Sequence, residues 1–399
     1  MTLKDICELI VDCPHVTDND EGFGYPLIRT PNVGKGMLLL ENVHRVSKDV
    51  YDRRNRRAKP QTGDLILARE APAGNVALIR ESQEVCLGQR TVLIRPNKNL
   101  VVPEFLTYYL LAPYNQHRIK QSANGSTVEH VNMPSIRGLE IELPTLHVQK
   151  EIASILSNYD TLIDINTKRI KILEESAREL YKEWFVRMRF PGYEQTKFVK
   201  GIPEGWKYMR IDENYKTGSG GTPSSSHNEY YNEGTINWIR TGELKDGFIF
   251  KSEIQITDKG LNNSSAKMYP PYSVIIAMYG NSIGQLGILS NPSSTNQACC
   301  VIQPKTIEYS WEFIYLSLIE YRQYLISFGF GAAQQNISQD EIKKFKIVFP
   351  KKEIAQSFTY MVHPLFKEIE ALQLQDQTLA STRDRLLPRL LSGELKVKA

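Results

Sequence analysis

The chain has 399 residues, 41% of them hydrophobic and 24% charged, and a formal net charge of +4. This length predicts two or three domains, and the composition is that of a globular protein with no run apolar enough to span a membrane. The early acidic residues exclude a signal peptide, and five cysteines without a CxxC pair argue against zinc sites or a disulfide framework. A cytoplasmic location fits these features, and the mild positive charge permits a polyanionic partner without requiring one.

The chain repeats one pattern after slightly more than half its length. Ile-Arg-Thr with a glycine six residues later occurs around Arg29 and again around Arg240. Three longer stretches also align: KPQTGDLILAREAPAGNVALI (59–79) with YPPYSVIIAMYGNSIGQLGIL (269–289), GQRTVLIRP (88–96) with NQACCVIQP (296–304), and GSTVEHVNMPSIRGLEIELP (125–144) with GAAQQNISQDEIKKFKIVFP (331–350). Such a long period excludes a solenoid and predicts two domains of one fold.

Each copy combines short strands with amphipathic helices. β-branched and aliphatic runs predict strands at 65–67, 92–94, 274–277 and 347–349. Apolar residues at helical spacing predict one helix at 104–119 and another at 312–326. The predicted fold class is therefore α+β, with two similar mixed domains.

After each copy, the hydrophobic spacing alternates between four and three residues, which is a heptad pattern. The apolar positions of the two patterns are Ile152, Leu156, Tyr159, Ile163, Ile170, Leu173, Leu180 and Trp184, then Phe358, Val362, Leu365, Ile369, Leu372, Leu379 and Leu386. Helices of about 40 residues span roughly 60 Å, and two such seams in one chain most simply bury each other. Asp376 and Arg383 interrupt the second seam; they either pair across the bundle or face a partner, and Pro364 predicts a kink.

These patterns predict five segments. They are a first mixed α/β domain (1–143), a long helix (144–188), a Gly- and Pro-rich linker (189–206), a second mixed α/β domain (207–350), and a second long helix with the C-terminal tail (351–399).

The common catalytic signatures are missing from the sequence. It contains no GxxxxGK[ST], HExxH or GxSxG motif. Tyr269–Tyr272 reads YPPY, which resembles the loop of amino-methyltransferases but lacks the amide or carboxylate that accepts a hydrogen bond from the target amine. We interpret it as a proline turn before a strand.

Several polar loops have the composition of a DNA-reading surface. Arginine matches phosphates and guanine edges, and asparagine or glutamine matches adenine, although solvated loops share this composition. The candidate DNA-binding residues are Arg29, Arg53, Arg54, Arg56, Arg57, Arg69, Gln89, Arg90, Ser126, Thr127, Arg240, Tyr279, Asn281, Ser282, Gln297, Gln334, Gln335 and Asn336. Different polar residues on one repeated framework suit a protein that reads two different sequences.

The whole chain resembles the specificity subunits of type I restriction–modification enzymes. The resemblance rests on RTPNVGKG, REAPAGNVALI with CLGQRTVLIRP, GSTVEHVNMPSI, LPTLHVQKEIASIL, LYKEWFVRMRFPGYE, IPEGW, GGTPSS with INWIRTGEL, and RDRLLPRLLSGEL. It implies that each domain reads half of a bipartite double-stranded DNA site. It also implies two antiparallel helices that set the spacer and dock two modification (methyltransferase) subunits.

The resemblance further implies that this chain has no active site and no cofactor. S-adenosylmethionine would bind the modification subunits, and ATP and Mg the restriction subunits that join some complexes. Three alternatives stay open: a modification-only or related phage-defence complex, a two-domain adaptor that does not bind DNA, and an enzyme acting alone. A lone enzyme would need a complete cofactor or metal site, which the sequence does not contain.

Overall fold

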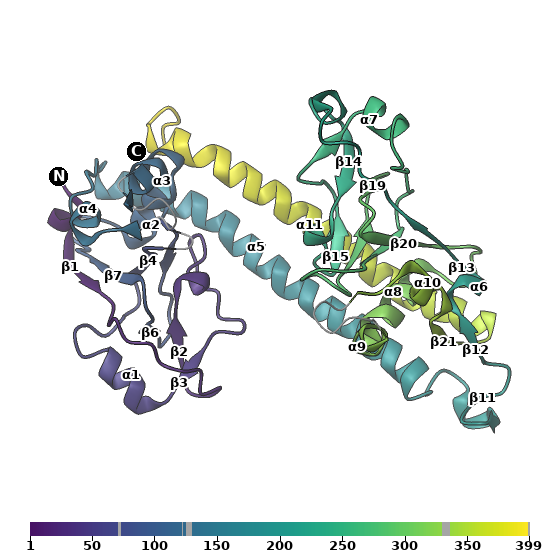
Figure 1. Ribbon diagram of the computed structural model, residues 1–399. Coiled ribbons are helices and arrows are strands. Elements are labelled where there is room, and N and C mark those ends of the chain that lie inside the picture. The colour runs from purple at the N-terminus through teal and green to yellow at the C-terminus, as the bar shows by residue number, and fades with distance from the viewer. Residues whose placement is uncertain (71–72, 122, 125–129, 329–335, 398–399) are drawn as a thin grey trace. The chain divides into compact units, whose positions relative to one another are not determined.

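The computed structural model describes residues 1–70, 73–121, 123–124, 130–328 and 336–397 (Figure 1). The chain forms two compact units. The first unit contains Met1–Ile163 and Thr378–Ala399, and the second unit contains Asp164–Gln377. Each unit therefore includes part of both long helices.

The first unit is built on an antiparallel sheet in the order β1-β7-β4-β5. These strands are β1 (Cys7–Asp12), β7 (Thr91–Pro96), β4 (Leu65–Ala68) and β5 (Val76–Leu78). A smaller sheet has the order β3-β2-β6, with β3 (Arg45–Val46), β2 (Tyr25–Ile28) and β6 (Cys86–Leu87); β8 (Ala123–Asn124) pairs with β9 (His130–Val131). The helices are η1 (Leu3–Ile6), η2 (Thr30–Asn32), α1 (Lys48–Arg54), α2 (Pro103–Leu111), α3 (Pro113–Gln121) and α4 (Met133–Arg137).

The second unit repeats both sheets in the same strand order and adds one edge strand to the main sheet. Its main sheet is β13-β20-β17-β18-β15 and its smaller sheet is β16-β14-β19. The strands are β13 (Tyr215–Ser219), β20 (Cys299–Pro304), β17 (Val274–Ala277), β18 (Leu286–Leu289), β15 (Gly247–Ile249), β16 (Gln255–Ile256), β14 (Ile236–Ile239) and β19 (Ser294–Thr295). In each unit the smaller sheet contains one parallel pair, β2 with β6 and β14 with β19. The sequence repeat is therefore a repeat of topology and register.

The remaining elements of the second unit are short. Two further strand pairs are β12 (Lys207–Arg210) with β21 (Lys346–Phe349), and β10 (Phe198–Val199) with β11 (Ile202–Pro203). The helices are η4 (Tyr193–Gln195), α6 (Ile211–Asn214), η5 (Asn228–Tyr230), η6 (Thr241–Glu243), α7 (Asp258–Asn262), α8 (Trp311–Glu320), α9 (Arg322–Ser327) and α10 (Gln339–Lys344).

Two predicted helices are each divided in the structure, so the prediction of single helices was wrong. The segment 104–119 forms α2 and α3, which are separated at Ala112 before Pro113. Proline has no backbone N–H and disfavours helical geometry in the residue before it, which explains this break. The segment 312–326 forms α8 and α9, separated at Tyr321.

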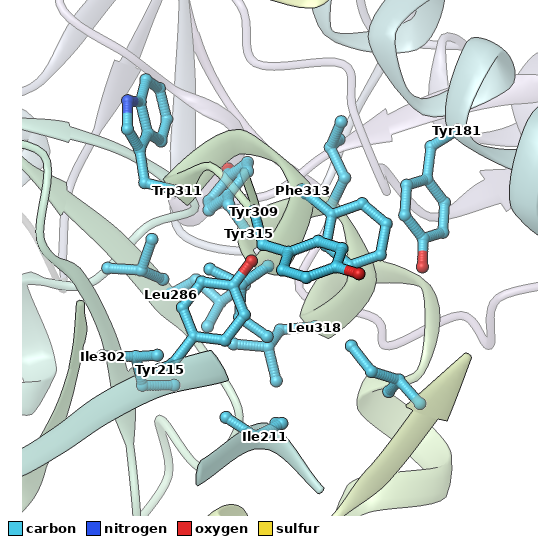
Figure 2. Close-up of a cluster of buried hydrophobic side chains, with 14 of the residues drawn as sticks. Tyr181, Ile211, Tyr215, Leu286, Ile302, Tyr309, Trp311, Phe313, Tyr315 and Leu318 are labelled. Carbon is cyan, nitrogen blue, oxygen red and sulfur yellow. The ribbon is translucent and has the colours of Figure 1, made fainter. Parts of the chain in front are cut away.

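Aromatic side chains dominate the core of the second unit (Figure 2). The rings of Tyr181 and Phe313 lie 5.9 Å apart, and those of Tyr309 and Phe313 lie 6.1 Å apart. The buried Tyr181 hydroxyl donates to Ser317 Oγ at 2.9 Å, so its polar atom is satisfied. Tyr181 belongs to the first long helix, which is therefore part of this core.

The two long helices are α5 (Leu146–Tyr181), extended by the π-helical turn η3 (Lys182–Val186), and α11 (Lys352–Leu391). In the second unit, Asn166 Nδ2 donates to Asp376 Oδ1 at 2.8 Å, and Arg169 pairs with Glu368. Partner numbers on α11 fall as those on α5 rise, so the helices are antiparallel. Every residue predicted for the heptad seams is buried or half-buried.

The polar residues in the seam pair across the bundle. Asp376 accepts from Asn166, and Arg383 forms an ion pair with Asp160 in the first unit. These contacts explain why Asp376 and Arg383 stand in the seam, without a partner protein. α11 is assigned as one uninterrupted helix through Pro364, so Pro364 does not end it as a helix breaker would.

Candidate nucleic-acid interface

The turn that follows the central strand is closed by an equivalent main-chain hydrogen bond in both units. After β4, the Gly74 N–H donates to the Ala68 carbonyl at 2.8 Å; after β17, the Gly284 N–H donates to the Ala277 carbonyl at 2.9 Å. Both glycines have positive φ, +92° and +76°, a conformation that other residues rarely adopt. The sequence repeat thus preserves a turn on which different side chains are mounted.

Arg69, the first residue of the turn in the first unit, is buried and fully engaged. Its Nη1 donates to both carboxylate oxygens of Asp12 at 2.8 and 2.7 Å, and its Nε donates to the Val131 carbonyl at 2.8 Å. A buried, bidentate arginine orders the elements that it joins. Arg69 therefore holds β1 and β9 beside the turn, in place of the DNA contact predicted for it.

A polar chain leads from Arg69 to the surface. Arg69 Nη2 lies 2.7 Å from His130 Nε2. Because a guanidinium can only donate, Nε2 is the acceptor, and Nδ1 carries the proton that it donates to Glu70 Oε1 at 2.5 Å. Glu70 Oε2 in turn accepts from Arg90 Nε at 2.8 Å. Arg90 is exposed, so this chain orients one outward-facing guanidinium.

The arginine-rich segment at the end of α1 and just after it contains both buried and exposed arginines. Arg54 is buried; it donates to Asp18 Oδ2 at 2.6 Å and to the Leu87 carbonyl at 2.7 Å, so it stabilises the loop and is not a surface contact as predicted. Arg53 is half-exposed and pairs with the same Asp18. Arg56 and Arg57 are exposed and form no ion pair with any residue that the structure describes. These two remain available to a phosphate.

The two equivalent glutamines make equivalent contacts. Gln89 Nε2 donates to Thr17 Oγ1 at 2.9 Å, and Gln297 Oε1 accepts from the Thr222 hydroxyl. Each bond ties the residue after the smaller sheet to the loop that follows β1 or β13. Each glutamine keeps its other amide atom for a further partner.

Arg29 and Arg240 also occupy equivalent positions, where β2 and β14 end. The backbone N–H of Arg29 donates to Asn32 Oδ1 at 3.2 Å, and that of Arg240 to Glu243 Oε1 at 3.0 Å. Both side chains are half-buried, and the Nε of each lacks a hydrogen-bond partner within the described part of the chain. Arg240 also pairs with Glu253 at 2.6 Å.

The second unit presents different chemistry on this frame. The Val131 N–H donates to the Arg69 carbonyl, and at the equivalent position of the second unit the Ile337 N–H donates to the Met278 carbonyl. The buried Met278 therefore corresponds to Arg69. The other equivalent pairs are Glu70 with Tyr279, Arg90 with Ala298, and His130 with Asn336. An acid–base chain in one unit is thus replaced by apolar and amide side chains in the other.

The predicted residues around the second turn are accessible. Tyr279, Asn281, Gln297 and Asn336 are exposed, and Ser282 is half-buried. Partial burial raises the pKa of the Tyr279 hydroxyl, which therefore stays protonated and able to donate. The predicted residues Ser126, Thr127, Gln334 and Gln335 lie outside the described residues.

Sequence reasoning did not select Asp12 or His130, which complete the polar chain. The alignment of VEHVN with QQNIS places His130 opposite Asn336, and this difference was the available signal. Asp12 carried no signal, because its contact with Arg69 joins residues that are distant in sequence.

The described ranges contain no group of three or more His, Cys, Asp or Glu side chains placed to hold a metal ion, and no helix long and apolar enough to cross a bilayer. Burial raises the pKa of Cys86, Cys299 and Cys300 to about 12, so these thiols are protonated at neutral pH and weakly nucleophilic.

Two curated proteins of Methanocaldococcus jannaschii are similar along most of their length. The type I restriction enzyme MjaIX specificity subunit is 28% identical over 84% of this chain and 78% of that protein. The putative MjaX specificity subunit is 26% identical over 99% of this chain and 93% of that protein.

A solved structure shares the fold. The crystal structure of a type I restriction-modification system S subunit from M. genitalium aligns with a TM-score of 0.60 over 98% of this chain and 95% of that chain, at 16% identity. The sequence model described as the type I restriction modification DNA specificity domain matches residues 1–175 and again 203–378. Both copies of the repeat are thus matched, and the chain belongs to the family of type I restriction–modification DNA specificity subunits.

Proposed function

We propose that each unit of this chain reads one half of a bipartite DNA site for a type I restriction–modification complex. The observation that carries the proposal is the repeated frame around this turn, which holds the Arg69–His130–Glu70–Arg90 chain in one unit and Met278, Tyr279 and Asn336 in the other. One backbone frame with two side-chain sets suits two different base sequences, because bases are distinguished by donor and acceptor patterns at their edges.

If the chain reads DNA, its outward-facing side chains contact either phosphates or base edges. Arg56 and Arg57 are phosphate contacts, because they are exposed and unpaired within the described residues. Arg90, Gln89, Asn281, Gln297 and Asn336 are candidates for base edges. Buried Arg54 and Arg69 position the loops that carry these groups.

The partner assignment follows from family membership. Two modification subunits carrying S-adenosylmethionine bind this chain, and restriction subunits using ATP and Mg join where the system also cleaves DNA. The chain itself supplies no cofactor and no catalytic group, and it acts in the cytoplasm, where the chromosome lies. The purified chain should therefore show no methyltransferase turnover without its partners, and turnover by the pure chain would overturn this assignment.

Methylation mapping tests the reader role directly. The host genome is sequenced for modified bases with this gene intact, deleted, and carrying a relative's segment in place of residues 27–143. Deletion should abolish methyl-adenine at one split motif, and the exchange should alter one half of that motif. Changes in both halves would contradict the assignment of one half to each unit.

The antiparallel helices also provide a test of spacing. Residues 164–170 of α5 contain Asn166, and residues 372–378 of α11 contain its hydrogen-bond partner Asp376. Deleting both segments removes both polar partners together and shortens each helix by about 10.5 Å, close to the length of three base pairs. The unread spacer should shorten by three base pairs, whereas deletion from α5 alone should disrupt the pairing.

Assays of methylation, cleavage and DNA binding distinguish two alternative functions. A modification-only complex would show methylation without cleavage of unmodified DNA. A two-domain adaptor would show no salt-dependent DNA binding when assembled with its partners. The repeated turn with exposed polar residues favours the DNA reader over the adaptor.

A further inference from the structure

The first unit contains a pocket of about 630 Å³ that the reading of DNA does not use. Its walls come from the turn before β4, from α2 and from α5, and they include Gly63, Thr107, Ser157, Asp160 and Thr161. This volume is within the range of pockets that hold specific ligands.

The second unit fills the equivalent space with its own side chains. Gly63 lies two residues before the Leu65–Ile94 pair of the sheet, and Tyr272 lies two residues before the equivalent Val274–Ile302 pair. Both have positive φ, +90° and +61°. The Tyr272 ring stacks on Trp311, with centroids 5.6 Å apart, and Trp311 contacts Phe366 at 5.1 Å.

Smaller side chains occupy the matching positions of the first unit. The helix repeat places Asp160 opposite Phe366 and Thr161 opposite Lys367, and Pro103 stands opposite Trp311. Three aromatic side chains, Phe366, Trp311 and Tyr272, are thus replaced by an aspartate, a proline and a glycine. The pocket is the space that these replacements leave.

The second unit, in which this space is filled, shows what kind of chemical group fits between the turn and the long helix. The Tyr272 hydroxyl donates to Glu370 at 3.1 Å, and the Lys367 ammonium lies 4.4 Å from the ring centroid. An aromatic ring with one polar atom therefore lies between the turn and the long helix. The pocket of the first unit also combines apolar and polar walls: Leu78 and Ile79 lie with the hydroxyl-bearing Thr107 and Ser157, and charged side chains complete the lining (Arg80, Glu81, Lys98, Glu104 and Asp160).

We propose that this pocket receives a tyrosine or tryptophan side chain of one modification subunit. The inference rests on the proposed function, because that function supplies the partner. The incoming ring completes the first unit as Tyr272 and Trp311 complete the second. Leu162, which follows the pocket residue Thr161 on α5, is an exposed apolar side chain. Buried tyrosine and tryptophan anchors dominate many protein interfaces.

The test replaces Ser157 with tryptophan, which fills the pocket from α5. Ser154→Trp is the matched control: it adds the same indole one turn earlier on the same helix, at an exposed serine that does not line the pocket. The full-length chain is titrated with the purified modification subunit, and bound copies are counted by native mass spectrometry and sedimentation velocity.

The wild type and Ser154→Trp should bind two subunits. Ser157→Trp should keep one subunit with unchanged affinity and bind the other at least about tenfold more weakly, as loss of an anchor residue predicts. The retained subunit shows that the second unit is intact. Thr161→Lys, which copies Lys367 at the exposed rim, should weaken the same subunit without adding volume to the core.

The outcomes separate the two proposals. If the wild type binds no modification subunit, the proposed function fails. If the wild type binds two and both Ser157→Trp and Thr161→Lys bind two with unchanged affinity, the pocket inference fails while the function stands. Equal weakening of both subunits by these variants would also overturn it, because a pocket in one unit cannot anchor both.

Discussion

Buried Asp160 on α5 and half-buried Arg383 on α11 form an ion pair whose equivalents in the second unit are apolar. The Asp160 carboxylate also accepts from the Tyr108 hydroxyl at 2.5 Å, and its side chain is 6% exposed. The helix repeat places Phe366 opposite Asp160 and Ala177 opposite Arg383, and both are buried. The two helices thus carry different side chains at positions that the repeat makes equivalent.

Arg383→Ala should destabilise the first unit by about 3–5 kcal/mol, because it leaves the Asp160 charge buried without its cation. The triple variant Tyr108→Leu, Asp160→Phe, Arg383→Ala copies Leu316, Phe366 and Ala177 of the second unit and should recover most of this loss. Urea unfolding followed by far-UV circular dichroism measures both. If the triple variant were as unstable as Arg383→Ala, the apolar equivalence would be wrong.

The Asp376 carboxylate makes stability depend on pH. Burial raises its pKa in the folded chain, although the hydrogen bond from Asn166 opposes this. A raised folded pKa means that its contribution to stability is greatest below the unfolded pKa and falls as pH rises through the folded value. Asp376→Asn cannot titrate, so its advantage over the wild type should grow from about pH 3 to about pH 7.

Thermal unfolding at several pH values measures this difference. Glu353→Gln, at an exposed carboxylate on the same helix, is the control and should show no comparable trend. A constant difference between Asp376→Asn and the wild type at all pH values would show that burial does not perturb Asp376.

Arg56→Ala with Arg57→Ala should weaken DNA binding without changing stability. Two lost phosphate contacts should reduce the slope of log K against log salt by about 1.8. The control Lys4→Ala with Lys120→Ala removes the same charge from exposed residues of the first unit. Fluorescence anisotropy of the assembled complex at several salt concentrations gives both slopes; equal slopes for the two double variants would show general charge attraction instead.

Arg90 combines a strained backbone with an exposed side chain. Its φ of +64° is unfavourable for residues other than glycine. Arg90→Gly should therefore be more stable than Arg90→Ala by about 1 kcal/mol, while both weaken methylation that depends on one half of the site. Unfolding and methylation of two half-site variants test these effects; equal stability would mean that the turn relaxes in Arg90→Ala.

The repeat and the heptads made the architecture predictable. Pairs such as Arg29 and Arg240 revealed two copies of one fold, and apolar spacing located both long helices because period is a local property of sequence. The roles of Arg54 and Arg69 could not be predicted, since only tertiary contacts with Asp18 and Asp12 bury them. Exposed Arg56 and buried Arg54 look alike in sequence.

Gln149 shows the same limit within the repeat. It is buried, accepts from the Val102 N–H at 2.9 Å and donates to the Pro144 carbonyl at 2.9 Å, whereas Gln356 is exposed. The helix offset places Ala355 opposite Gln149. Two glutamines that lie one position out of register in the repeat are therefore not equivalent residues, and only the packing around them reveals this.

The division of the helices between the units has a consequence for synthesis of the chain. The second unit is contiguous and is complete once Gln377 has left the ribosome. The first unit begins at Met1, but its core includes Leu387 and Leu390. This core can therefore form completely only after the last part of the chain has been synthesised. The first unit is thus the first to be synthesised and the last to complete its fold. A premature stop after residue 377 would remove part of the core of the first unit and leave the second unit whole.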